Sequence, residues 1–483
     1  MPTSLDAQTP TSASAPESGG RRPSLSARSR QALRQHPWTL VVGLACASLL
    51  ALGLVDNARG PMLSAIMQAY ALNHTQASWF FFLASGAGLI HNAVFLKFLS
   101  HAQPLKMLFL YMAIMATGVL ILGITPLFSS SYGIFLMGTV CMGVGFGGLG
   151  VAQNACVQEA PDKYRAQSTA LLHATYGLAS LSSPFLIVQI RSWGLAKESS
   201  NWSLSFVVCA IPALCLLPIV FRELSLRRSR QPEANASTSI ESMESMAPMP
   251  RLSASQTRAA WSAGLLLSAM VVAEISISSR LVIFAEEMDW PQSTAGLWLT
   301  GFFVALTLAR LSLAIGVWDQ IALRFYGLSG CFSEGIGECF GGRQPSGQAE
   351  PSKEAYDPSR RLRLVLGCAL PLLILGLVDF GWPTRWSMLA LVLFGFPIAM
   401  AYPLAITWYA KAFGANRQSV LSLAVTLQSA AAMLMHLLLG WGADQYGLRQ
   451  ALLVISVGSL VLALALLEPL RRQLTPNPAI HSS

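Results

Sequence analysis

The sequence predicts an all-α polytopic membrane protein with twelve transmembrane helices in two six-helix halves. Hydrophobic residues make up 53% of the 483 residues and charged residues only 11%, whereas a soluble domain carries about 25% charged residues. Mean hydropathy is +0.51. Apolar stretches of about 20 residues recur along the chain, each long enough to cross a hydrocarbon core of about 30 Å. The composition excludes most soluble enzymes and nucleic-acid-binding domains.

The chain begins with a polar segment, residues 1–36, which is rich in Ser, Thr, Ala and Pro. Such a segment buries too little apolar surface to fold, so we expect a disordered tail. The first apolar stretch is long enough to span, which predicts a retained helix and not a cleaved signal peptide. The predicted spans are 38–57, continuing past Pro61, then 78–98, 106–127, 131–155, 167–190, 203–221, 260–284, 294–316, 364–380, 386–409, 419–440 and 450–469.

The basic residues give the orientation. Of the 32 Lys and Arg residues, 25 lie in the tails and in alternate links, four lie in the other links and three lie within spans. Because Lys and Arg concentrate on the cytoplasmic side, this bias predicts a plasma-membrane protein with both termini in the cytoplasm, in a bacterial inner membrane. The net charge of +9 is therefore a topology signal and does not indicate a nucleic-acid partner.

Two long cytoplasmic links divide the chain. Residues 222–258 are rich in Ser, Met, Pro and Arg, as expected for a flexible connector between halves at 37–221 and 259–470. Residues 318–362 form a Gly-rich insertion within the second half, and residues 471–483 form a second cytoplasmic tail. A weak repeat supports two parallel halves, because "YRAQSTALL" (164–172) opens the fifth span and "ANRQSVLSL" (415–423) opens the eleventh.

Charges within spans are the first candidates for function, since a charge at mid-membrane costs about 2.5 to 3.5 kcal/mol. Asp56 and Arg59 lie late in the first span at a spacing of three residues, which also fits a pair that neutralises itself. Gly60 and Pro61 follow and weaken the helical backbone ladder there, as often occurs beside a cavity. Asn57 is a candidate ligand for a polar solute.

Glu274 is the sharper candidate, because about fifteen apolar or small residues precede it in the seventh span. A carboxyl group at that depth can exchange a proton, as a coupling site requires. Arg280 lies six residues further on, nearly on the opposite face of a straight helix, so a direct ion pair between the two is not expected. Arg310 lies toward the inner end of the eighth span and is a candidate gating residue.

Uncharged polar side chains add candidate ligands for the solute. Asn154, His173 and Gln428 lie within spans, and Tyr402 lies beside Pro403, where its ring could stack on a sugar or simply pack. His91 and His436 fit packing better than ligation. The many glycines of the fourth span favour close helix packing. No phosphate loop, nucleophile elbow or zinc-ligand spacing is present, so we expect no enzyme activity, no metal and no cofactor.

Several stretches together resemble the major facilitator superfamily, and within it the fucose permease-like branch of fucose/glucose/galactose:proton symporters. They are "LVDNARGPML" (54–63), "NACVQEAP" (154–161) followed by "ALLHATYG", the segment Ala273 to Arg310, and "AMAYPLAI" (399–406). The resemblance covers the spans but neither the tails nor the insertion. It implies alternating access around a central cavity, with a carboxylate on the first helix and a glutamate on the fourth.

Carried over, the first-helix carboxylate corresponds to Asp56, with the family's Asn-Asp order reversed, and the fourth-helix glutamate corresponds to Gly150. The family's basic motif between the second and third helices is also degraded here, to "KFLSHAQPLKM". The resemblance implies that these carboxyl groups bind the proton and the sugar, so we expect Asp56 and Glu274 to be the proton-coupling or sugar-binding carboxylates. With no glutamate at Gly150, Glu274 is the preferred proton carrier. The predicted function is proton-coupled transport of a small polar solute, a monosaccharide by preference. The alternatives are an uncoupled facilitator, an exporter of another solute, and a non-transporting sensor that signals through residues 318–362.

Overall fold

The computed structural model describes residues 37–99, 103–192, 202–230, 253–314 and 358–474. In the described part the first half holds six helices. They are α2 (Pro37–Ala69), α3 (His74–Leu99), α4 (Pro104–Phe128), α5 (Tyr132–Gln158), α6 (Asp162–Ser192) and α7 (Leu204–Arg230). Each corresponds to one predicted span, and α2 continues through Pro61 as expected.

The second half repeats this arrangement. Its helices are α9 (Ala254–Glu286), α10 (Gln292–Ala314), α12 (Pro358–Leu377), α13 (Thr384–Phe413), α14 (Arg417–Tyr446), and a last helix made of α15 (Leu448–Leu452), a π-helical turn η3 (Leu453–Val457) and α16 (Gly458–Leu474). A short 3₁₀ turn η2 (Gly414–Asn416) precedes α14. Eleven helices of the described residues are long and apolar enough to cross a membrane. The remaining helix, α12, corresponds to the span predicted at 364–380.

Helix ends extend beyond the predicted spans. Helix α7 continues to Arg230 and α9 starts at Ala254, so both ends of the predicted 222–258 linker are helical. Ser253 caps α9, because its side chain accepts from the backbone of Gln256 while the Gln256 side chain accepts from the backbone of Ser253. The tail 1–36, the linker centre and most of the 318–362 insertion lie outside the described residues.

The glycines of α5 allow close approach to α3 and α4. A Cβ placed on Gly147 would lie 2.7 Å from the backbone oxygen of Gly88 in α3, and one on Gly145 would lie 2.6 Å from the backbone of Met115 in α4. A real Cβ essentially never makes contacts shorter than 3.0 Å, so only glycine fits at these positions. The glycine-rich span is therefore a packing surface, as its composition predicts.

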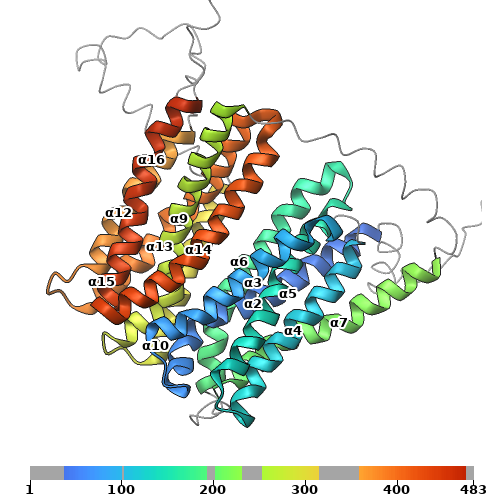
Figure 1. The fold of residues 1–483 in the computed structure, drawn as a ribbon, viewed down its shortest axis with the longest axis horizontal. Helices are drawn as coiled ribbons and strands as arrows, with labels where there is room; N and C mark the ends of the chain where they lie inside the picture. Colours follow the sequence, from blue (N-terminus) through green and yellow to red (C-terminus); the bar gives the residue numbers. More distant parts are fainter. Residues whose placement is uncertain (1–36, 100–102, 193–201, 231–252, 315–357, 475–483) are drawn as a thin grey trace, which may run out of the picture.

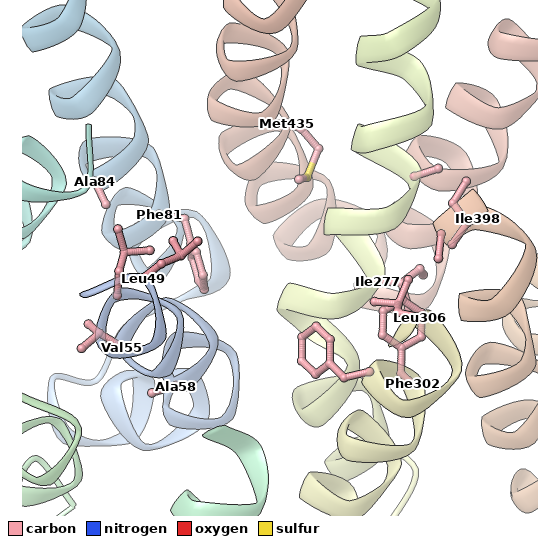
Figure 2. Close-up of a cluster of buried hydrophobic side chains, with 14 of the residues drawn as sticks. Leu49, Val55, Ala58, Phe81, Ala84, Ile277, Phe302, Leu306, Ile398 and Met435 are labelled. Atoms are coloured by element: carbon pink, nitrogen blue, oxygen red, sulfur yellow. The ribbon is translucent and has the colours of Figure 1, made fainter. Parts of the chain in front are cut away.

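The two halves meet along three helix pairs: α3 with α14, α6 with α10, and α2 with α9. Figure 1 shows the helices of the two halves coming together at one end and spreading apart toward the other. The buried hydrophobic side chains of both halves belong to one apolar cluster. Figure 2 shows Leu49, Val55 and Ala58 on one side of the interface and Ile277, Leu306 and Ile398 on the other.

Polar contacts close the end where the halves meet. Asp444 of α14 accepts hydrogen bonds from the backbone N–H groups of His74 and Thr75, both at 2.8 Å, so it caps the first turn of α3 from the opposite half. Ser64 donates to Glu286 (3.2 Å). Arg280 donates from Nη2 to the Ser78 hydroxyl (2.5 Å). Glu287 lies 3.7 Å from His74 in the same region. We call this set the seal; its members are Ser64, His74, Thr75, Ser78, Arg280, Glu286, Glu287 and Asp444.

Candidate functional site

A cavity of about 300 Å³ lies between the two halves. Helices α2, α3 and α6 of the first half and α9, α10, α13 and α14 of the second supply its lining. Six predicted site residues line it, namely Asp56, Asn57, Glu274, Arg310, Tyr402 and Gln428. The volume is at the lower limit of the 300 to 1,000 Å³ typical of small-molecule sites. It therefore suits a ligand of monosaccharide size.

Asp56 is held by two donors. Arg59, one helical turn further along α2, forms an ion pair with Oδ1, and Tyr176 of α6 donates its hydroxyl to Oδ2 at 2.7 Å. The self-neutralising pair suggested by the spacing of Asp56 and Arg59 thus forms, and Tyr176 ties it to α6. With both oxygens engaged, Asp56 has little freedom to exchange a partner during a transport cycle.

Glu274 has a simpler environment. Its Oε1 accepts from Nη2 of Arg310 at 3.2 Å, across from α9 to α10, and its side chain is 18% exposed. The pair joins two helices of the same half and lies on the cavity wall. Arg280 does not pair with Glu274, as its position six residues away predicts. Among the described residues, Arg310 is the only cation within 4.0 Å of this carboxylate.

Polar groups that can form further hydrogen bonds complete the cavity wall. The Oε1 atom of Gln428 is buried and has no hydrogen-bond partner in the described part of the chain. Asn57 lines the cavity and donates its amide to the backbone oxygen of Gly53 at 2.8 Å. Ser180 and Thr307, which sequence reasoning passed over, also line the cavity. Such groups can form hydrogen bonds with the hydroxyls of a polar solute.

Two predicted ligands are absent from the cavity wall. Asn154 is exposed on α5 and its amide donates to the backbone oxygen of Gly150. His173 is exposed on α6, about one turn before Tyr176. Gly150 itself has open space beside it, since a Cβ there would meet nothing within 4 Å. Both ligand assignments remain predictions.

His436 lines the cavity, although sequence reasoning favoured a packing role for it. It is 4% exposed and its ring stacks on Phe81 with 4.6 Å between centroids. Tyr409 of α13, by contrast, is fully buried outside the cavity and donates to the backbone oxygen of Ala263. His436 and Tyr176 carry no sequence signal that separates a cavity residue from a core residue.

A comparison with protein families matches residues 9–333 to the sequence model described as Major Facilitator Superfamily. The chain belongs to the major facilitator superfamily. This confirms the superfamily predicted from the sequence, together with the helical membrane fold, and places the protein among transporters and not enzymes. No curated protein matches the chain.

Solved structures of other superfamily members share this fold. The E. coli fucose:proton symporter FucP is 15% identical, with a TM-score of 0.53 over 91% of this chain and 100% of FucP. An inward-open structure of the E. coli xylose transporter XylE is 11% identical, with a TM-score of 0.64 over 92% of this chain and 98% of XylE. An inward-facing bacterial homologue of the lysosomal transporter Spinster is 14% identical, with a TM-score of 0.62 over 92% and 99%. At these identities the likeness shows the fold alone.

Proposed function

We propose that this protein is a proton-coupled carrier of a monosaccharide, working by alternating access in a bacterial inner membrane with both termini in the cytoplasm. The observation that carries the proposal is the cavity between the halves, which is walled by a carboxylate, Glu274, with one charged partner. The structures of a fucose:proton symporter and of a xylose transporter, which share the fold, favour a sugar as the solute.

With the termini inside, the seal closes the outer side, and the described conformation faces inward. The Glu274–Arg310 ion pair is made by a carboxylate and not by a carboxylic acid, so it belongs to a state that has released its proton. Protonation from the outer side breaks the pair and frees the guanidinium of Arg310 to bind solute hydroxyls. Proton and solute then enter together, and deprotonation inside restores the pair.

Asp56 serves solute binding in this scheme and not coupling, because Arg59 and Tyr176 hold both of its oxygens. Asn57, Gln428 and Tyr402 supply hydrogen bonds and an aromatic face. His173 and Asn154 belong to the path on the inner side, and Arg310 links proton release to the movement of α10. The Asp56 assignment thus departs from the first-helix carboxylate coupling that the family resemblance implies.

The test is uptake of labelled hexoses and 6-deoxyhexoses into proteoliposomes, with and without an inward proton gradient. We expect the gradient to stimulate uptake of at least one sugar. Glu274→Gln should lose that stimulation yet keep solute exchange, because an amide cannot take up and release the coupled proton. The matched control is Glu159→Gln, a carboxylate that pairs with Arg227 outside the cavity. Unchanged stimulation in Glu274→Gln, with loss in Asp56→Asn, would assign the proton to Asp56.

A further inference from the structure

One end of the cavity carries a cluster of cationic and N–H-donating groups around a single ring. The guanidinium of Arg59 lies 5.2 Å from the Phe81 centroid and that of Arg280 lies 5.6 Å from it, while the His436 ring stacks on it. Phe81, Arg59 and His436 line the cavity, and Arg280 follows Ser279, which also lines it. We call these four side chains the cationic end.

The donors of the cationic end are not saturated. Buried nitrogens without a hydrogen-bond partner among the described residues are Nη1 of Arg59, Nε and Nη1 of Arg280, and Nδ1 of His436. His436 is only 4% exposed and lies on the cavity wall. Leaving so many buried polar groups unpaired is costly, which indicates a missing partner. Most of them are N–H groups, so that partner is an acceptor.

Arg280 is the side chain that makes this end positive. It is 1% exposed, donates a hydrogen bond to the Ser78 hydroxyl and lies over the Phe81 ring. No carboxylate of the described residues lies within 4.0 Å of its guanidinium, and Asp444 of the seal acts on it only from beyond ion-pair distance. A buried guanidinium with no carboxylate at ion-pair distance is expensive, and stacking on a ring offsets only part of the cost.

The ion pairs at the cavity leave one nearby cation without a paired carboxylate. The charged residues that line the cavity pair one for one, Asp56 with Arg59 and Glu274 with Arg310, whereas Arg280 lies beside the cavity with no carboxylate at ion-pair distance. Arg280 lies behind Phe81, but the protein between it and the cavity has a low dielectric constant, so the field of the guanidinium reaches the cavity. One excess positive charge matches a monoanion. A phosphate monoester, with a charge of about −1.5 to −2 at pH 7, exceeds it.

We propose that the solute is an acidic monosaccharide, whose carboxylate lies at the cationic end and whose hydroxyls bind Gln428 and the remaining wall. This inference rests on the proposed function and narrows its substrate class. The hydroxyls of a hexuronate can donate to the Gln428 oxygen, and its carboxylate can accept from the donors around Phe81.

The test compares matched sugar pairs on the purified full-length protein. Binding of radiolabelled galacturonate and galactose, and of glucuronate and glucose, is measured by scintillation proximity. A hydrogen bond to a charged group contributes about 1.5 to 3 kcal/mol, so we expect each acid to bind at least about tenfold more tightly than its neutral partner. The ratio of acid to neutral affinity is the readout, because a change in conformational equilibrium affects both sugars alike.

Substitutions test whether the cationic end produces the ratio of acid to neutral affinity. Arg280→Gln should bring the ratio to within about twofold of one while neutral sugars still bind, and Arg280→Lys should keep most of it because the charge remains. The matched control is Arg385→Gln, since Arg385 also lies over a ring, that of Trp386 at 5.8 Å, but at the start of α13 outside the cavity. Its ratio should equal that of the wild type.

Other results would overturn the proposal, in distinguishable ways. Equal affinity for acids and neutral sugars would remove the carboxylate and leave the proposed function standing. Tighter binding of sugar phosphates than of hexuronates would replace the carboxylate by a phosphate. Binding of lactate as tightly as of hexuronates would retain the anion site but overturn the sugar, and with it the proposed function. Binding of neither acids nor neutral sugars would overturn both.

Discussion

The carboxylates Asp56 and Glu274 differ in how many donors hold them. Asp56 has Arg59 on one oxygen and Tyr176 on the other, whereas Glu274 has Arg310 alone among the described residues. A carboxylate held on both oxygens is a fixed structural and binding group. One with a single, partly exposed partner can trade it for a proton, so the same residue type performs two roles because of its surroundings.

The Tyr176 hydroxyl gives a direct test of the fixed role. In Tyr176→Phe, Asp56 keeps Arg59 but loses the 2.7 Å bond, and the free energy of unfolding should fall by about 1 to 2 kcal/mol. Thermal unfolding of the purified protein in detergent measures the change. Tyr446→Phe, at a ring that is 65% exposed, is the control and should stay within about 0.5 kcal/mol. Equal midpoints for the two variants would mean that the Tyr176 bond adds no stability.

The cost of a charge in the membrane made Asp56 and Glu274 predictable from sequence, and both line the cavity. Tyr176 and His436 were not predictable as cavity residues, because an aromatic side chain in a span reads the same whether it packs or faces a cavity. Asn154, which the sequence offers as a ligand, does not line the cavity in the described structure. The position of a polar residue on a helix face depends on helix rotation, which the sequence pattern of an almost wholly apolar helix does not determine.

At the scale of helices, the spans and their order followed from length and hydropathy, and the internal repeat lies where the structure has equivalent helices. The segments 164–172 and 415–423 lie at the starts of α6 and α14, each the fifth helix of its half. Helix ends were less predictable, as α7 and α9 extend into the polar linker. A capping box and helix-compatible polar residues continue a helix past the membrane without an apolar signal.

The glycines of α5 lead to a prediction about this packing. Gly147→Val places a branched side chain against the backbone of Gly88, which cannot move aside, so we expect a loss of about 1 to 3 kcal/mol or failure to yield monodisperse protein. Gly150→Ala is the matched control on the same helix, because its Cβ meets nothing within 4 Å. Size-exclusion profiles and thermal midpoints compare the two. An unchanged Gly147→Val variant would show that α3 and α5 tolerate separation.

For the whole molecule, the seal sets which side is closed. Asp444 caps α3 from the other half, and a capping carboxylate contributes about 1 kcal/mol. Asp444→Asn should therefore raise the population open at the seal about fivefold. Spin labels at exposed positions 71 and 445, on either side of the seal, measure that population as a longer distance. Asp379→Asn, an exposed carboxylate paired with Arg449, should leave the distances unchanged.

Glu287 gives the seal a predicted pH dependence. The Glu287 side chain is 42% exposed, and its partial burial raises the pKa of the carboxyl while Arg449 lowers it in part; His74 lies 3.7 Å away. The closed seal therefore binds a proton at Glu287 more readily than an open, hydrated seal does. As pH rises from the ordinary value of 4.5 through the raised pKa, the closed state loses stability, and the long distance between the labels should gain population. Glu287→Gln should flatten this response, and an equal response in both proteins would assign it to other groups.

The glycine contact between α3 and α5 also provides a reference distance within the protein. Since the backbones of Gly88 and Gly147 leave no room to slide, the two helices should travel as one body whichever side of the membrane is open. A pair of probes on α3 and α5 should report a constant distance through every turnover, while a pair on α3 and α14 reports the motion. Any change in the distance between the probes on α3 and α5 then indicates damage to the protein and not transport.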